Sequence, residues 1–439
     1  MAALPSYTRG ISARSSVWIP PAQVEYLFFF ALFYSIASSY LEIEVPLLAT
    51  AIMVALAGFC IVQFGPQAKQ VYRPIRFLFA CGISLITIQI FLHGEPKLAD
   101  THREFINWML ALVVVQSLSL RRRFFHRLAL VLFAIGLLAI PNLSFHVGEV
   151  ERARSGANLS GNLRNPNGLG EWFGYCVVYF AICGFYTRRV VIRIASWLIA
   201  IGCLFIVGLT VSRGSLLGCA VAITVGFRHI LKRGFVPLLI LILLTGVIYE
   251  TGVFHEITGE YAERATEETG REKLWPDAIA RLFASPLTPL IGLGVSNIGT
   301  DVLVPGDATP PHNAFLYFAL SSGVVPLALY VVFWFQVARR SPSRNDTSAN
   351  EEFRLPLLAF TFVIIMLGDL GFMSPWGVLA FSLAAGSGIS HQISHPHFVR
   401  RRQGVRMLQR APYPRCANVN GTQFTRRPEI ARRRKLHPW

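Results

Sequence analysis

Long apolar stretches separated by short polar connections repeat along most of the chain. Each has roughly the 17–25 residues that an α-helix needs to cross the hydrocarbon core of a bilayer. We expect twelve such spans, at residues 24–41, 43–64, 74–92, 104–120, 128–145, 168–187, 190–211, 214–231, 234–250, 313–337, 355–371 and 375–390. The last two are short, so eleven crossings or a re-entrant pair are the alternatives. The pattern predicts an all-α polytopic membrane protein with about 12 transmembrane helices.

One long polar segment, Thr251 to Pro311, interrupts this pattern between the ninth and tenth spans. Loops of such length are usually either functional or disordered. This segment is neither low in complexity nor uniformly charged, and it carries Arg271 and Trp275 before the chain reaches His312. We therefore expect residues 251–312 to form a functional loop at the membrane surface.

The ends of the chain differ from the membrane domain, which we place at residues 24–390. Residues 1–23 form an N-terminal arm without a cleavage pattern, so the first apolar run is interpreted as a signal anchor. Residues 391–439 are rich in Arg and Pro and contain few large apolar side chains. Such a segment cannot bury a core, so we expect a disordered basic tail beside anionic membrane lipids.

The charge balance supports a membrane protein and orients it. The chain is 53% hydrophobic and 15% charged, whereas a soluble domain carries about 25% charged residues. With the N-terminus in the cytoplasm, 31 of the 41 Lys and Arg residues fall on the cytoplasmic side. This bias follows the positive-inside rule and explains the net charge of +17 without a nucleic-acid partner. We expect both termini in the cytoplasm and the long loop on the external face of the membrane; the family resemblance described below implies that this is the periplasmic face of a bacterial inner membrane.

The seven cysteines do not form a metal site or a disulfide framework. Six of them lie inside apolar spans, and no pair has the spacing of metal ligands. Free cysteine is often buried as a small apolar residue, so we expect these six to be core residues.

Two arginines on the predicted external face are candidates for binding an anion. Arg213 lies in so short a connection between the seventh and eighth spans that it must sit near the headgroup plane. Charges at this depth usually face a cavity or a partner, although an arginine that snorkels to the interface is an equal alternative. Arg271 follows Glu267 by four residues, so a surface salt bridge is the alternative for this position.

His312 is the candidate base. Two prolines precede it and favour an extended approach, and Asn313 can cap the helix of the tenth span. The imidazole would then lie at a helix N-terminus, whose partial positive charge disfavours protonation. A neutral imidazole suits a general base. The alternative is a histidine that only completes a turn.

Together these residues predict an anion site beside a base. Two guanidinium forks suit a pyrophosphate. A lipid-linked pyrophosphate would leave without needing a proton, whereas an attacking hydroxyl must lose one, and His312 is placed to take it. No external Asp-x-Asp or Asp-Glu pair offers metal ligands, so we expect neither a metal nor a cofactor.

The long loop contains signals of local structure around Arg271. Thr269 and Glu272 fit a capping box, which predicts a helix with Thr269 as its cap. Pro276 predicts an interruption of that helix after Trp275. An apolar face then predicts a short helix on the membrane surface, formed by Leu274, Ile279, Leu282 and Phe283. No strand precedes Gly292-Leu293-Gly294, so we interpret this stretch as a turn rather than a phosphate loop.

A shorter external segment, residues 146–167, leads into the sixth span. Its Asn-Pro-Asn-Gly sequence is typical of a turn and predicts that Asn167 caps the following helix. The possible cavity-lining residues on this face are Arg164, Asn167, Glu171, Trp275 and Asn313.

These motifs resemble the superfamily of O-antigen ligases and O-antigen polymerases, which are membrane glycosyltransferases. The resemblance covers about residues 165–330, and the first five spans match only by topology. The similar motifs, in order, are Asn165-Pro166-Asn167, Ser212-Arg213-Gly214, Gly270-Arg271 with Trp275, Pro286 followed by Gly292-Leu293-Gly294, His312-Asn313-Ala314-Phe315-Leu316, and Gly323.

The resemblance implies transfer of a glycan from an undecaprenyl-pyrophosphate carrier to the hydroxyl of a lipid or saccharide acceptor, without metal, in the biosynthesis of a surface polysaccharide such as lipopolysaccharide. Carried over by position, Arg213 and Arg271 bind the pyrophosphate and His312 activates the acceptor. The sequence does not separate a ligase from a polymerase. A transporter or flippase is the alternative of another class, but no inverted repeat is evident. A structural scaffold is a third, in which Arg213, Arg271 and His312 would be replaceable.

Overall fold

The computed structural model describes residues 19–37, 47–64, 75–94, 100–118, 121, 124–139, 143–144, 156–157, 166–187, 189–210, 212–227, 270–304, 307–339 and 350–367. The chain divides into two units, residues 1–394 and 395–439, and the described residues all belong to the first. The predicted spans at 234–250 and 375–390, Arg164, most of the N-terminal arm and the basic tail lie outside the described residues.

The protein is helix-rich, as the apolar pattern predicts. In chain order the described helices are α1 (Ala22–Ala37), α2 (Leu48–Phe64), α4 (Ile75–Phe91), α5 (Asp100–Leu118), α6 (Phe124–Ala139), α7 (Pro166–Tyr186), α8 (Val190–Leu209), α9 (Arg213–Gly226), α13 (Arg271–Leu282), α14 (Thr288–Ile291), α15 (Ala314–Ser322), α16 (Val324–Arg339) and α17 (Asn350–Leu367), with a 3₁₀ turn, η4, at Val295–Asn297.

Two short antiparallel strand pairs accompany the helices. Strand β1 (Leu143–Ser144) pairs with β2 (Gly156–Ala157), and β3 (Thr300–Val304) pairs with β4 (Asp307–Thr309). The apolar pattern did not predict these strands: β1 falls at the end of the span expected at 128–145, and the other three lie in polar connections between apolar runs. The second pair lies inside the long loop, so the described part of that loop is structured.

Most predicted spans correspond to a described helix, but their lengths differ. Among the described residues, Asn167–Tyr186 and Val190–Leu209 are long and apolar enough to cross a membrane, and the other apolar helices are shorter. The span expected at 313–337 is two helices, α15 and α16, because the chain turns at Gly323 with a φ of +79°. A total of about twelve crossings therefore stays a prediction.

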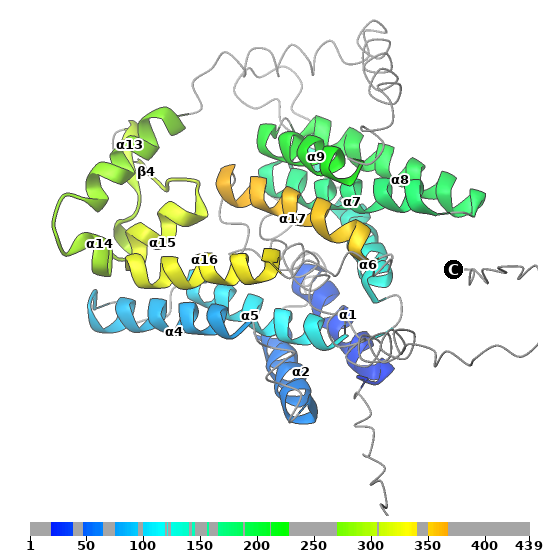
Figure 1. The fold of residues 1–439 in the computed structure, drawn as a ribbon, viewed down its shortest axis with the longest axis horizontal. Helices are drawn as coiled ribbons and strands as arrows, with labels where there is room; N and C mark the ends of the chain where they lie inside the picture. Colours follow the sequence, from blue (N-terminus) through cyan, green and yellow to red (C-terminus); the bar gives the residue numbers. More distant parts are fainter. Residues whose placement is uncertain are drawn as a thin grey trace, which may run out of the picture. The chain divides into compact units, whose positions relative to one another are not determined.

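The described helices form two packed sets. Helix α7 packs against α8, α9 and α17, and α9 and α17 also pack together. Helices α4 and α16 lie side by side, with α14 and α15 beside them (Figure 1). The prediction for the cysteines is confirmed, because Cys60, Cys81, Cys176, Cys183, Cys203 and Cys219 are all free and buried.

Phe360 fixes the position of α17 against α7 and α9. Its ring is fully buried, and methyl groups added at Gly174 and Gly218 would lie only 2.5 and 3.0 Å from it. The neighbouring Thr361 Oγ1 is 2.5 Å from the hydroxyl of Tyr175 on α7. Small residues allow helices in membranes to approach closely, and these contacts set where the C-terminal end of α17 lies.

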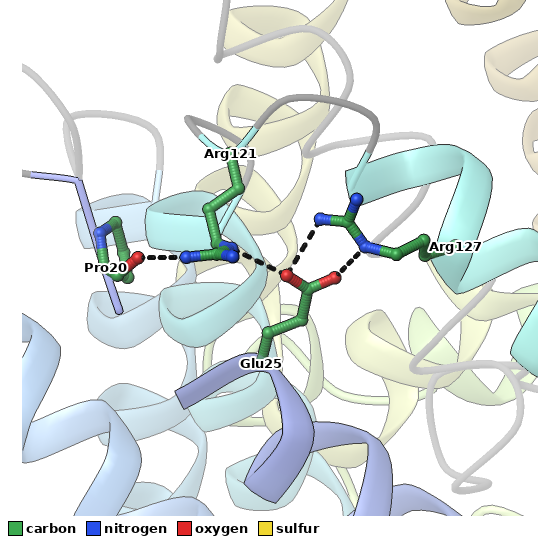
Figure 2. A network of polar contacts seen from close by, with 4 residues as sticks. All are labelled: Pro20, Glu25, Arg121 and Arg127. Carbon is green, nitrogen blue, oxygen red and sulfur yellow. Dashed lines mark hydrogen bonds and ion pairs between the residues drawn. The ribbon is translucent and has the colours of Figure 1, made fainter. Parts of the chain in front are cut away.

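A buried carboxylate joins α1 to the connection between α5 and α6 (Figure 2). Glu25 is 2% exposed and accepts hydrogen bonds from Arg121 Nε at 2.7 Å and from Arg127 Nε and Nη2 at 2.5 and 2.9 Å. Arg121 Nη1 also donates to the carbonyl of Pro20 at 2.6 Å. The charge count assigns Glu25 and these arginines to the same membrane face, and the structure brings them into contact.

We expect Glu25→Gln to destabilise the folded protein by about 2 kcal/mol, because the amide leaves two neighbouring guanidinium groups without a counter-charge. The measurement is the thermal unfolding midpoint of the full chain in detergent. Asp301→Asn, at an exposed carboxylate on β3, is the control. Equal midpoints for the two variants would contradict a stabilising role for the Glu25 network.

Candidate functional site

Three basic residues from distant parts of the sequence come together around Arg271, which lies within electrostatic reach of Arg213 and of His312. Arg213 begins α9, Arg271 begins α13, and His312 precedes Asn313, the N-cap of α15. Burial lowers the pKa of Arg271, and the charge of Arg213 lowers it further. Burial also lowers the pKa of His312, with a further contribution from Arg271. We call these three residues the cationic cluster.

The turn that carries Arg213 is short and packed. Ser212 is the N-cap of α9, and its hydroxyl lies 3.0 Å from that of Ser215. Gly170 of α7 approaches this turn so closely that a methyl group there would lie 2.8 Å from Thr210 Oγ1. Arg213 itself is half-buried. The turn therefore presents this arginine from a fixed backbone.

The start of α13 differs from the predicted capping box. The N-cap is Gly270, in the left-handed conformation with φ +72°, and no side chain caps the helix. Helix α13 then runs from Arg271 through Pro276 to Leu282, so the predicted interruption after Trp275 is wrong. Pro276 is the sixth residue of the helix, and removes only one hydrogen bond of its first turns. Arg271 thus occupies the first helical position.

The C-terminal end of α17 contacts all three elements of the cluster. The carbonyl of Leu367 accepts a hydrogen bond from Arg271 Nη2, and the carbonyl of Met366 accepts one from Asn313 Nδ2 at 3.2 Å. A methyl group at Gly214, next to Arg213, would lie 3.9 Å from Leu367 Cβ. The last carbonyls of a helix carry partial negative charge, which suits a guanidinium. Sequence reasoning missed this role, because an apolar run gives no signal that its backbone carbonyls bind side chains.

His312 has a backbone conformation that histidine seldom adopts. Its φ is +46°, in the left-handed region, so the expected extended approach ends before this residue. Trp275 Nε1 donates to the carbonyl of Pro311 at 2.9 Å, which ties α13 to the histidine segment. Uncommon backbone conformations of this kind concentrate at functional sites.

The predicted N-cap after His312 is confirmed. Asn313 Oδ1 accepts hydrogen bonds from the backbone N–H groups of Phe315 and Leu316 at 2.9 and 3.1 Å. The direction predicted for the histidine is also confirmed, since its pKa lies below the ordinary value. The causes are burial and Arg271, whereas the sequence argument used the helix terminus. A neutral imidazole is therefore favoured at this position.

The remaining candidate residues have mixed outcomes. Asn167 is the second residue of α7 rather than its cap, because Pro166 takes the first helical position. Glu171 lies one residue after Gly170 and is buried. Trp275 and Asn313 hold the histidine segment in place through hydrogen bonds. Arg164 lies outside the described residues.

The Gly292-Leu293-Gly294 stretch is a turn, as expected, and it packs against the end of α15. Gly292 and Gly294 have φ values of +74° and +88°. The N–H of Leu293 donates to the carbonyl of Leu320 at 2.6 Å, and that of Gly294 to Ser321 at 3.1 Å. These contacts connect the long loop to the helix that follows His312.

Gln89 in α4 and His93, two residues after the end of α4, hold the same turn. The buried Gln89 donates to the Ser321 carbonyl at 2.7 Å and accepts from the Val295 N–H at 2.9 Å. His93 Nε2 lies 2.9 Å from the carbonyl of Ile291. Sequence reasoning missed both residues. The available signal was a glutamine inside an apolar run, since buried polar side chains in a membrane domain need partners.

We expect Gly323→Ala to misplace the loop that carries the cluster. The new methyl group would lie 2.2 Å from the carbonyl oxygen of Leu290, and alanine is strained at a φ of +79°. The folded fraction should fall by an amount that corresponds to more than about 2 kcal/mol, measured by thermal unfolding. Gly202→Ala in α8, where a methyl group meets no atom within 4 Å, is the control. Equal stability of the two variants would rule out this packing.

The site can bind a strongly anionic group and accept a proton beside it. The charge of Arg213 lowers the pKa of Arg271, so an anion bound between the two arginines would offset an unfavourable interaction. His312 lies near Arg271, and its lowered pKa favours the neutral imidazole, which can accept a proton. Such a pairing suits the displacement of an anionic leaving group by a hydroxyl nucleophile.

Residues 194–331 match a family model described as O-antigen ligase. The matched segment includes all three residues of the cationic cluster and ends within α16. Helices α7 and α17, which pack against it, lie outside the matched segment. No curated protein matches the chain.

Proposed function

Because the chain carries a domain of the O-antigen ligase family, we propose that it is a membrane glycosyltransferase that moves a glycan from an undecaprenyl-pyrophosphate carrier to an acceptor hydroxyl. The reaction takes place on the external face of a bacterial inner membrane, with both chain termini in the cytoplasm. The acceptor is a lipid or a saccharide of the cell envelope.

In this proposal the two arginines bind the pyrophosphate. The acceptor oxygen attacks the anomeric carbon of the glycan, and the bond from that carbon to the phosphate oxygen breaks. The electron pair leaves with the undecaprenyl pyrophosphate, whose charge Arg213 and Arg271 neutralise. His312 takes the proton of the acceptor hydroxyl and later releases it to water.

One observation supports this assignment most strongly: Arg271 lies close enough to Arg213 for that charge to lower its pKa, and close enough to His312 to lower the pKa of the imidazole. The sequence separates the three residues widely, so their meeting is a property of the fold. A scaffold has no use for two neighbouring half-buried arginines, whereas a site for a doubly charged leaving group does.

The test replaces Arg213, Arg271 and His312 singly with alanine and measures surface glycan, with the amount of membrane-inserted protein checked for each variant. We expect all three variants to lose glycan at normal abundance. Normal glycan in the His312→Ala strain would refute the role of this residue as the base. Normal glycan in all three strains would refute the enzyme assignment.

Product analysis separates a ligase from a polymerase of the same superfamily. Loss of a ligase leaves polymer attached to the carrier, whereas loss of a polymerase leaves single repeat units. We expect the first pattern. We also expect transfer to continue in EDTA, because two guanidinium groups supply the positive charge that a metal would otherwise provide.

A further inference from the structure

An exposed row of large apolar side chains runs along the outer side of α13 and α14. Phe283 is 69% exposed and Leu287 is 61% exposed, and Ile279 and Leu290 are also exposed. The prediction from sequence placed Leu274, Leu282, Ile279 and Phe283 on one face. The structure divides them, because Leu274 is buried toward the protein while Ile279 and Phe283 point away from it.

Contacts on the opposite side of α13 fix the direction in which this row points. Leu274 and Ala278 are buried, and Arg281 donates hydrogen bonds to the carbonyls of Gly299 and Asn297 at 2.7 and 2.6 Å. The helix therefore cannot turn over to bury Phe283 without breaking these contacts. The apolar row is a permanent surface of the folded loop.

The row continues onto two apolar helices. The chain at Gly323 comes close to the Leu290 carbonyl, and α16 packs against α14; Val325, near the start of α16, is exposed. The contact of His93 with the Ile291 carbonyl likewise brings the end of α4 there, where Phe91 is 78% exposed. Figure 1 shows α14 beside the ends of α4 and α16. We call these six residues, Phe91, Ile279, Phe283, Leu287, Leu290 and Val325, the apolar ledge.

Exposed apolar side chains also follow α4 and α16 away from the ledge. Ile83 on α4 and Val331 and Phe335 on α16 are exposed, as lipid-facing positions of a membrane protein are. The helices that carry the ends of the ledge, α4 and α16, therefore also carry exposed apolar side chains of the kind that face lipid. An exposed apolar surface of this extent in water would be an aggregation hazard.

We propose that the apolar ledge is inserted into the external leaflet of the bilayer, at the boundary between headgroups and acyl chains. Apolar residues on one side of a surface helix, with polar contacts on the other, are the pattern of interfacial helices. Lys273 and Glu272, exposed at the opposite end of α13, remain in water.

The ledge gives α13 a fixed depth, and this consequence depends on the proposed function. Arg271 is the first residue of α13, so anchoring the far end of the helix in the leaflet sets the height of this arginine. The pyrophosphate of a lipid-linked donor lies at the headgroup level. The ledge thus matches the height of the cationic cluster to that of its substrate.

The experiment measures depth directly in the full-length protein. Phe283→Cys and the control Lys273→Cys are labelled with bimane in a Cys416→Ser background and reconstituted into phosphatidylcholine–phosphatidylglycerol vesicles. We expect lipids brominated at carbons 6 and 7 to quench the bimane at position 283 strongly and that at 273 little. Aqueous iodide should quench the bimane at position 273 strongly and that at position 283 little. If iodide quenches both positions equally, or if neither quencher reaches position 283, the ledge is not in the bilayer.

A second measurement separates this inference from the proposed function. We expect Leu287→Asp to raise the donor KM at least 10-fold and to reduce the bromolipid quenching at position 283, whereas Leu287→Phe preserves both. Quenching does not require catalysis, so a protein that shows the expected depth but transfers no glycan would refute only the proposed function. An unchanged donor KM in Leu287→Asp, despite a reduced depth, would refute the link between ledge and cluster.

Discussion

His312→Gly is expected to lower the rate of glycan transfer at least about 100-fold, because a positioned general base contributes about 10²–10⁴-fold to a rate. Glycine removes the imidazole but adopts a positive φ without strain. The variant should therefore fold at least as stably as His312→Ala, which keeps the strained φ of +46°. The measurements are transfer by purified protein in vesicles and the thermal unfolding midpoint of both variants.

The pH dependence of the wild-type protein gives a second test of the same residue. The base works when neutral, so transfer should fall as the pH falls through the pKa of His312. Burial and Arg271 lower that pKa, so the acid limb should lie below the ordinary value of about 6.5. In Arg271→Gln, the remaining activity should have its acid limb at higher pH, because one of the two causes is removed.

Two results would contradict the role of His312. One is a His312→Gly variant that transfers glycan at a rate near wild type. The other is a His312→Asn variant that restores the rate, because asparagine tolerates the left-handed conformation but is not a base. The second result would mean that the backbone conformation matters and the imidazole does not.

Arg271→Lys is expected to weaken donor binding by about 10- to 100-fold, even though the charge is kept. The guanidinium of Arg271 donates through Nη2 to the carbonyl of Leu367, and its planar fork carries further N–H donors. A lysine ammonium cannot hold the carbonyl and present a planar fork at once. The loss of one charged hydrogen bond, about 1.5–3 kcal/mol, corresponds to this range.

The measurement is the donor KM, with Arg281→Lys as the matched control on the same helix. Arg281 also binds backbone carbonyls, but those of residues 297–299, and the proposal gives it no ligand. We expect Arg281→Lys to lower stability while the donor KM per folded molecule stays at the wild-type value. If the donor KM rises equally in both variants, Arg271 acts only by holding the loop.

The sequence predicted the site best where a single residue type leaves few alternatives. An asparagine before an apolar run caps a helix in most contexts, and Asn313 does so. A charged residue in a very short connection between two apolar runs must lie at the end of one of the two helices, and Arg213 is the first residue of α9. The glycines of the Gly-Leu-Gly turn both adopt positive φ values.

The failures have a common physical cause, which is competition between local signals and tertiary contacts. Thr269 and Glu272 fit a capping box, yet the N-cap of α13 is Gly270, and Pro276 is accommodated inside the helix. Arg271 and Trp275 hold the helix before the proline and Arg281 holds it after the proline, each through a hydrogen bond to a distant carbonyl. Backbone acceptors such as the Leu367 carbonyl have no sequence signature, so their partners cannot be predicted from one sequence.

The contact between α17 and the cationic cluster also limits which segment of the chain can be exchanged with that of a similar protein. The segment that matches the ligase family contains every basic residue of the cluster, but the carbonyls that orient Arg271 and Asn313 come from Met366 and Leu367, beyond its end. A chimera that exchanges residues 194–331 between two such proteins therefore inherits the host's backbone anchors. Such a chimera is expected to work only if the host's counterpart of α17 places these carbonyls within reach of Arg271 and Asn313.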